Sequence, residues 1–313
     1  MAVSGTLRFI WRAVSFTAGT AGVMALLFAG WLAFVWPPPS WWRTHYPAST
    51  AFQRMRARQY QALGDTVSFR YRPVPWDSIS RWLREAATAG EDDAFYQHNG
   101  LDWRMMREAI GYRRERFDWH NPRDRADLLC AIGRAWEHPE RLRGASTITQ
   151  QLAKNLYLSP SRNPLRKLKE AVIAFRLEAA LSKQRILELY LNVAELGPNL
   201  WGVEAASRHY FGRPASELPL EQAALLIATL PHPLSSNPAF RPGRTRWRQQ
   251  YILRRLRGEP VEMPLEADDE RLPLPPPLPV PDSLAPIPDS LAPIPDSLAP
   301  APPTDTPRVN PPI

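Results

Sequence analysis

Hydrophobic residues recur at helical spacing over most of the chain. Between residue 76 and about residue 258 they occupy positions i, i+3, i+4 and i+7, and no sustained alternation of polar and apolar residues predicts a sheet. Four places carry residues that begin helices: Thr147 with Gln150 as a capping box, Asn163-Pro164, Ser182 and Leu218-Pro219. The pattern therefore predicts a mostly α domain over residues 76–258.

The helix that begins at Pro164 is expected to be amphipathic. Charged residues occupy several of its faces, and one apolar stripe runs along it, formed by Leu165, Leu168, Val172 and Phe175. We expect this stripe to be the apolar face of the helix.

A run of 24 residues without a charge, residues 13–36, precedes the domain. As a helix it is long enough to cross a hydrocarbon core of about 30 Å. Arg8 and Arg12 favour a cytoplasmic location for residues 1–12 and an external one for everything after the run. Tryptophans typical of a membrane interface lie at the outer end of the run, namely Trp31, Trp36, Trp41 and Trp42. We expect a single-pass anchor; the alternative is a cleaved signal peptide, although its apolar run is usually only ~7 to 15 residues long.

Proline-rich segments flank the domain on both sides. Residues 37–75 contain six prolines among basic and aromatic residues, and predict a juxtamembrane connector close to the lipid headgroups. Residues 259–313 repeat the segment Asp-Ser-Leu-Ala-Pro every seven residues from Asp282. Prolines this frequent exclude a helix, and the apolar surface is too small to offset the entropy of ordering. We predict a disordered tail that is either a spacer or a docking segment.

Charge is divided unevenly along the chain. The net charge is +8, but residues 260–313 hold 9 acidic and 2 basic side chains, so residues 1–259 carry +15. This excess predicts an anionic partner: a nucleic acid, an acidic membrane surface or a phosphate-bearing substrate. Cys130 is the only cysteine, which excludes an intrachain disulfide, and the six histidines lack the spacing of a structural zinc site.

Four polar clusters stand out within the helical region. They are residues 91–100 (EDDAFYQHNG), 144–155 (GASTITQQLAKN), 162–170 (RNPLRKLKE) and 183–192 (KQRILELYLN). Taken singly, each has an ordinary structural explanation: a solvated helix end, a capped amphipathic helix, a salt bridge at i, i+4 spacing, and a core helix.

Taken together, the clusters resemble the motifs of glycosyltransferase family 51, which occurs in single-activity peptidoglycan transglycosylases and in class A penicillin-binding proteins. They match E-D-x-x-F-x-x-H-x-G, G-x-S-T-I-x-Q-Q-L-x-K-N, R-K-x-x-E and K-x-x-I-L-E-x-Y-L-N in order and spacing. The resemblance covers residues 76–238, about half of the chain. Two departures are Ala145, where glycine is commoner, and residues 111–143, which are longer and more charged than the expected link.

The resemblance implies a lysozyme-like α-helical glycosyltransferase domain that polymerises lipid II into β-1,4-linked glycan strands. The C1 carbon of a muramyl sugar would join the 4-hydroxyl of an incoming glucosaminyl unit, with inversion at C1 and release of polyprenyl diphosphate. A hydroxyl is a poor nucleophile, so a carboxylate must accept its proton, and the motif position assigns that role to Glu91. The departing diphosphate needs cationic stabilisation.

The motif positions also imply which residues bind the substrate. The expected substrate-binding residues are Asp92, Phe95, Ser146, Gln150, Gln151, Lys154, Asn155, Arg162, Arg166 and Lys169. Of these, Lys154, Arg162 and Lys169 are expected to hold the diphosphate. Glu170 is expected to be the second catalytic carboxylate, which either orients the cations or helps to hold a divalent metal such as Mg²⁺; the chemistry allows a metal without requiring one. Phe95 is also expected to form an apolar wall beside Glu91, together with Tyr96.

These expectations place the enzyme at the bacterial cytoplasmic membrane, with its catalytic domain on the periplasmic side. The expected partners are lipid II, the growing lipid-linked strand, the membrane and other cell-wall synthesis or division proteins, and not a nucleic acid. The S-x-x-K and K-T-G signatures of a transpeptidase are absent. Two alternatives stay open: a lysozyme-like muramidase that cuts glycan, and an inert anchored scaffold that recruits partners through its tail.

Overall fold

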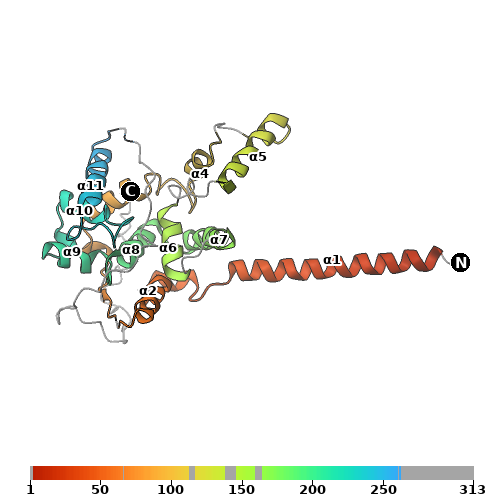
Figure 1. Cartoon of the computed structure of the whole chain (residues 1–313), viewed down its shortest axis with the longest axis horizontal. Helices are drawn as coiled ribbons and strands as arrows, with labels where there is room; N and C mark the ends of the chain where they lie inside the picture. The colour runs from red at the N-terminus through yellow and green to blue at the C-terminus, as the bar shows by residue number, and fades with distance from the viewer. Residues whose placement is uncertain are drawn as a thin grey trace, which may run out of the picture.

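The computed structural model describes residues 3–65, 67–112, 117–137, 146–158, 164–259 and 261. Most of these residues are helical, which confirms the prediction of a mostly α fold (Figure 1). In chain order the elements are α1 (Val3–Ala33), η1 (Pro39–Arg43), α2 (Ala51–Ala62), β1 (Arg70–Tyr71), η2 (Trp76–Ser78), α3 (Arg81–Glu91), α4 (Trp103–Ala109), α5 (Pro122–Glu137), α6 (Ile148–Tyr157), α7 (Pro164–Ala180), α8 (Lys183–Val193), β2 (Glu195–Gly197), β3 (Leu200–Trp201), α9 (Val203–Phe211), η4 (Ala215–Glu217), α10 (Leu220–Ile227) and α11 (Gly243–Leu256).

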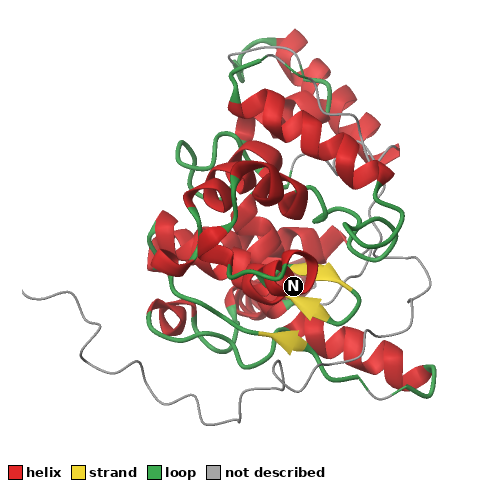
Figure 2. Ribbon diagram, turned by 90° about the vertical axis from the view of Figure 1, so that its left-hand side faces the viewer, coloured by secondary structure: helices red, strands yellow, loops and turns green. Residues whose placement is uncertain are grey.

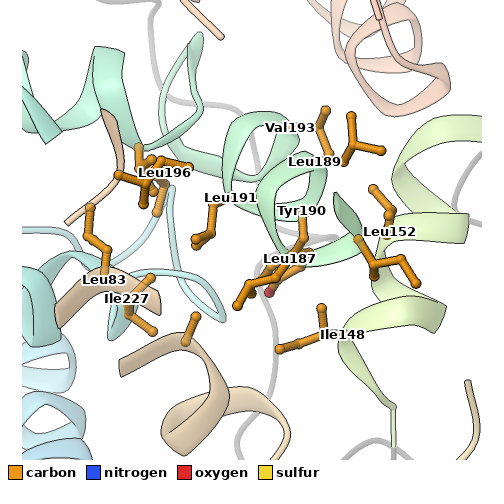
Figure 3. Close-up of a cluster of buried hydrophobic side chains, with 14 of the residues drawn as sticks. Leu83, Ile148, Leu152, Leu187, Leu189, Tyr190, Leu191, Val193, Leu196 and Ile227 are labelled. Atoms are coloured by element: carbon orange, nitrogen blue, oxygen red, sulfur yellow. The ribbon is translucent and has the colours of Figure 1, made fainter. Parts of the chain in front are cut away.

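The hydrophobic core surrounds α8. Every residue of this helix from Ile186 to Val193 is buried, as expected for a helix that is covered on all sides. Figure 3 shows its leucines between Ile148 and Leu152 of α6 on one side and Leu83 of α3 and Ile227 of α10 on the other. The helices that carry the first, second and fourth sequence clusters therefore meet in one core.

The predicted helix starts are confirmed where the structure describes them. Thr147 caps α6 in a capping box: its hydroxyl accepts from the Gln150 backbone N–H, and the Gln150 side chain accepts from the Thr147 N–H (3.0 Å). Ser182 caps α8 through its hydroxyl, and α7 begins at Pro164. Asn163 lies outside the described residues.

A small sheet was not expected from the sequence. β3 lies between β1, to which it is parallel, and β2, to which it is antiparallel (the strands in Figure 2). Strands of two or three residues are too short to show an alternating pattern. Gly202 follows β3 with φ +79°, and a Cβ at this position would lie 2.4 Å from the Asn192 carbonyl oxygen. Only glycine fits there.

The apolar stripe predicted on α7 is real, but it does not face the core. Three of its four residues are between 42% and 46% exposed: Leu165, Leu168 and Phe175. The buried face carries Ile173 and Leu177 instead, because α6 packs on that side. α1 lies against α7, where Lys169 Nζ is 4.4 Å from the centre of the Trp31 ring. The helix therefore has two apolar faces, of which the sequence analysis identified the exposed one.

α1 extends away from the rest of the molecule (Figure 1). Its C-terminal half exposes large apolar side chains, among them Leu26, Leu27, Phe28 and Trp31. The prediction that residues 13–36 cross a membrane is not confirmed: in the described part of the chain, no helix is both long enough and apolar enough to do so.

The predicted connector, residues 37–75, is folded against the domain. Trp42 is buried, and its indole Nε1 donates to the Tyr157 hydroxyl (2.6 Å), which donates in turn to the Pro37 carbonyl oxygen (2.9 Å). Arg185 of α8 donates through Nε to the Trp42 carbonyl oxygen (2.7 Å). These bonds fasten the segment after α1 to α6 and α8.

α2 is held to the domain by a buried ion pair. Arg56 donates to Glu195 of β2 through Nε (2.9 Å to Oε1) and Nη2 (2.9 Å to Oε2), the two-point geometry that arginine and carboxylate favour. Beside it, the Phe52 ring lies edge-on to the buried Trp201 ring, with centroids 5.6 Å apart. Polar and aromatic residues of the predicted juxtamembrane connector are thus part of the folded body.

The segment between the first two sequence clusters is only partly described. α4 and α5 stand apart from the helices around α8 (Figure 1). Residues 113–116 and 138–145 lie outside the described residues, as does the predicted tail from residue 262 onward.

Candidate active site

Glu91 lies where three helices meet. It is the last residue of α3, and its side chain is 8% exposed. Its carboxylate Oε1 accepts from Arg248 Nη2 of α11 (3.0 Å), and Oε2 accepts from Gln151 Nε2 of α6 (3.0 Å). Gln151 was expected to bind substrate; in the structure it binds Glu91.

A buried tyrosine orients Gln151. The Tyr190 hydroxyl of α8 donates to Gln151 Oε1 (2.9 Å), which leaves the amide nitrogen to face Glu91. Burial, and secondarily the nearby Glu91 charge, raises the pKa of Tyr190 well above its ordinary value. The hydroxyl therefore remains a donor at any physiological pH.

Other residues of the first cluster connect the segment after α3 to the start of α6. The Asp92 carboxylate binds His98 Nε2 (2.9 Å) and accepts from the Ile148 backbone N–H at the start of α6 (3.0 Å). The Gly100 carbonyl oxygen accepts from the Thr147 hydroxyl (2.6 Å). Gly100 has φ +95°, and a Cβ there would lie 3.2 Å from the backbone of α7. Asp92 is 2% exposed, so the structure gives it this connecting role and no surface for a substrate.

Phe95 is also placed in the core. It is fully buried, its ring is 5.0 Å from that of Tyr96, and Lys183 Nζ lies 4.5 Å from its centre. Tyr96 is 61% exposed. The groups bound to the Glu91 carboxylate are polar rather than the apolar walls expected from these two rings.

A second set of charged side chains surrounds Ser146, directly before α6. Lys167 Nζ donates to the Ser146 hydroxyl (2.8 Å) and also to Glu170, while Arg166 Nη1 donates to Glu170 Oε2 (2.8 Å). The Glu170 side chain is 3% exposed, whereas those of Arg166 and Lys167 are 23% and 42% exposed. We call Ser146, Arg166, Lys167 and Glu170 the cation cluster.

Lys167, which the sequence analysis did not select, takes the place expected for Lys169. Lys169 lies over the Trp31 ring, and burial there lowers its pKa. Residues two apart on a helix point about 200° away from each other, so only one of the two lysines can face Ser146. The motif contains both, and its spacing does not tell which side of α7 meets α6.

The other expected substrate-binding residues differ in their placement. Gln150 is 2% exposed and occupied in the capping box, and Asn155 is 8% exposed. Lys154 is half-buried, with Nζ 5.8 Å from the centre of the Phe52 ring. Arg162 lies outside the described residues.

Glu91 and the cation cluster lie beside the same end of α6. Glu91 binds Gln151, and Lys167 binds Ser146, five residues earlier. Ser146 lies two residues before α6, and Gln151 lies in its first turn. The carboxylate and the group of cations are thus both attached at the N-terminal end of this helix.

The expected metal site does not fit the residues present. Both Glu170 oxygens are bound by cations, Lys167 and Arg166. In the described part of the chain, no three His, Cys, Asp or Glu side chains gather as metal ligands would. No step of the mechanism below is therefore assigned to a metal.

The fourth cluster supports the fold. The Asn192 side chain accepts from the Val74 N–H (2.8 Å) and donates to its carbonyl oxygen (2.9 Å), and Lys183 Nζ binds Glu178 (2.7 Å). Tyr190 alone in this cluster reaches the site, through Gln151.

Comparisons with known proteins identify the family of the chain. The family described as Transglycosylase matches residues 112–257, a range that includes Gln151, the cation cluster and Arg248 but not Glu91. The chain is 40% identical over 240 residues to a biosynthetic peptidoglycan transglycosylase of Azoarcus sp., with 75% of this chain and 91% of that protein covered. Proteins of the same name from Aromatoleum aromaticum (39%, covering 70% and 86%) and Bordetella pertussis (38%, covering 78% and 94%) are similar. The chain therefore belongs to the peptidoglycan transglycosylase family and is an enzyme.

Proposed function

We propose that this transglycosylase polymerises lipid II into β-1,4-linked glycan strands with Glu91 as the general base. The observation that carries the proposal is the pairing of one carboxylate and several cations at the same end of α6. The two parts correspond to the two needs of the reaction: an acceptor for a hydroxyl proton and a counter-charge for a diphosphate.

The carboxylate performs the proton transfer. As the 4-hydroxyl oxygen of the glucosaminyl unit bonds to the muramyl C1, its proton passes to Glu91 and the C1–oxygen bond to the diphosphate breaks. The bonding electrons leave with the diphosphate, and attack from the opposite face inverts C1. A diphosphate is a stable anion, so its departure needs no proton.

The cations hold the diphosphate. Arg166 and Lys167 are partly exposed beside the Ser146 hydroxyl, and Lys154 lies one turn beyond Gln151 on α6. Each charge-assisted hydrogen bond to a phosphate oxygen contributes about 1.5–3 kcal/mol. Glu170 fixes Arg166 and Lys167 in place; the role of Arg162 stays a prediction.

Glycan hydrolysis is disfavoured by the same geometry. An inverting hydrolase needs one carboxylic acid for the leaving alcohol and a second carboxylate to activate water. Glu170, the expected second carboxylate, has both oxygens bound to cations and cannot activate water. Transpeptidation is not proposed, because its signature motifs are absent from the sequence.

We also propose that the domain works against the outer face of the bacterial cytoplasmic membrane. Large apolar side chains are exposed on the adjoining α1 and α7, among them Trp31, Phe34, Leu165, Leu168 and Phe175. The +15 charge of residues 1–259 adds attraction to anionic lipids. Lipid II is held in the same surface, so association confines the search for substrate to two dimensions.

The test is polymerisation of purified lipid II in detergent by the full chain, by Glu91→Gln and by Glu85→Gln. Glu85 is an exposed glutamate on the same helix, 48% accessible, and is the matched control. We expect polymer from the wild type and Glu85→Gln, and a rate about 10³-fold lower for Glu91→Gln. Equal rates for the two variants would contradict Glu91 as the base, and release of reducing ends from isolated cell wall would favour the muramidase.

A further inference from the structure

We propose that Arg248 is a positioning residue for Glu91, an inference that rests on the proposed role of Glu91 as the base. Arg248 lies on α11, more than 150 residues away in sequence and outside all four motif clusters. Its Nη2 donates both to Glu91 Oε1 (3.0 Å) and to the Gly90 carbonyl oxygen (2.9 Å). One guanidinium nitrogen thus binds the backbone and the side chain at the end of α3.

The packing of α11 on α3 sets this contact. Gly90 lacks a side chain where Ile252 of α11 comes close: a Cβ on Gly90 would lie 3.0 Å from Ile252 Cδ1. The start of α11 is fixed separately, because Thr245 donates from its hydroxyl to the Ser236 carbonyl oxygen (2.8 Å) and Ile252 is fully buried. Arg248 therefore reaches Glu91 from a rigid helix.

Because the Arg248–Glu91 ion pair is buried, the arrangement in which the two side chains stay paired is favoured. The Arg248 and Glu91 side chains are 4% and 8% exposed. Removing one partner of a buried pair leaves the other charge desolvated, at a cost of several kcal/mol. The ion pair therefore holds the Glu91 carboxylate turned toward α11.

The two carboxylate oxygens have separate partners. Oε1 is bound by Arg248, and Oε2 is bound by Gln151, which Tyr190 orients in turn. An ionised carboxylate oxygen has two lone pairs, so each oxygen retains one for a sugar hydroxyl. These hydrogen bonds hold the Glu91 carboxylate in one orientation and still allow it to accept a hydrogen bond from the substrate.

Arg248 acts through Glu91 and not on the substrate. With 4% of its side chain exposed, it has no surface on which a sugar or phosphate could rest. Its substitution should therefore lower kcat and leave KM nearly unchanged, in contrast to loss of a substrate-binding cation.

The experiment compares Arg248→Gln, Arg248→Lys and the control Arg246→Gln, an exposed arginine on the same helix. Steady-state polymerisation of lipid II is measured for each variant, together with its thermal unfolding. For Arg248→Gln we expect kcat to fall about 100-fold with KM changed less than about threefold. Arg248→Lys keeps the charge and should recover about tenfold.

Other charged groups near Glu91 are unchanged in these variants. They are Asp92, paired with His98; Asp93, paired with Arg255 and Arg104; and Tyr190. A lowered kcat is therefore attributable to Arg248.

Several results would overturn the inference. One is a wild-type kcat in both Arg248→Lys and Arg248→Gln; another is a raised KM at unchanged kcat, which would make Arg248 a substrate ligand. Should Arg248→Gln fail to fold, Arg248→Lys is the test. A lowered kcat in a variant that unfolds at the wild-type temperature would then support the positioning role, and a wild-type kcat would overturn it. Activity in Glu91→Gln would instead refute the proposed function, so the two failures are distinguishable.

Discussion

The two halves of the site are built in opposite ways. Glu91 is held by three other helices, through Arg248, Gln151 and, behind it, Tyr190, and all of these side chains are buried or nearly so. The cation cluster draws on one helix and the residue before α6, and its positive side chains are open to solvent.

The difference follows from what each half does. A base must meet one hydroxyl at hydrogen-bond distance, so its position matters more than its charge, and a displacement of about 1 Å can cost 100-fold in rate. A diphosphate offers many oxygens and long-range charge, so cations that are partly exposed to solvent can bind it. We therefore expect the base to be sensitive to packing and the cations to be sensitive to salt.

Apart from the changes at Glu91 and Arg248 described above, the largest effect on activity is expected at Lys167. Lys167→Met removes a cation from beside Ser146, and kcat/KM for lipid II should fall about 30-fold, the equivalent of one charged hydrogen bond. Lys169→Met, which loses only a contact with Trp31, should change kcat/KM less than about threefold in detergent. Steady-state kinetics at low and high ionic strength checks both, and the wild-type advantage over Lys167→Met should shrink in salt. A greater loss for Lys169→Met would restore the assignment made from the sequence.

A smaller effect is expected where the two halves are joined. Gly100→Ala places a side chain at φ +95° and against the backbone of α7, and should cost about 2 kcal/mol, or roughly 4–8 °C in Tm. Because Gly100 binds Thr147 at the start of α6, activity should fall about 3- to 10-fold. Gly64→Ala is the control: its φ is +86°, but no atom lies within 4 Å of the added Cβ. Equal melting temperatures for the two variants would show that the contact with α7 is unimportant.

The smallest effect concerns Tyr190 and appears mainly at alkaline pH. Burial raises the pKa of Tyr190, so the folded state favours the neutral hydroxyl; this stabilisation is complete below about pH 10 and is lost as pH rises toward the folded-state pKa. Tyr190→Phe should lower activity about threefold, through Gln151, and should lose less stability than the wild type between pH 10 and 12. Urea unfolding at pH 8, 10 and 11.5 checks this. Tyr60 and Tyr157, whose pKa values burial raises to about 12, are common to both proteins. An equal loss of stability in the wild type and in Tyr190→Phe between pH 10 and 12 would contradict this prediction.

Local signals in the sequence predicted much of the helical framework. Thr147, Ser182 and Pro164 begin helices as expected, because caps and proline act within one turn. The sheet and the folding of residues 37–75 were missed, since they depend on contacts such as Arg56 with Glu195, across more than 100 residues.

The site was predicted in outline only. Glu91 and Glu170 lie near the same end of α6, and their catalytic roles stay predictions, whereas Asp92, Phe95 and Gln150 are buried and support the fold. A motif marks residues that are needed without separating those that touch substrate from those that shape the loop. Arg248 belongs to no motif cluster, and only the approach of α11 to Gly90 reveals it.

The joint after α1 has a consequence for the reach of the enzyme. Trp42 and Tyr157, together with Arg185, fasten the chain to α6 and α8 within ten residues of the end of α1. A flexible linker would let the domain change its orientation relative to α1, whereas these bonds hold the two together. At the proposed lipid surface, the joint would keep Glu91 at one height above the lipid.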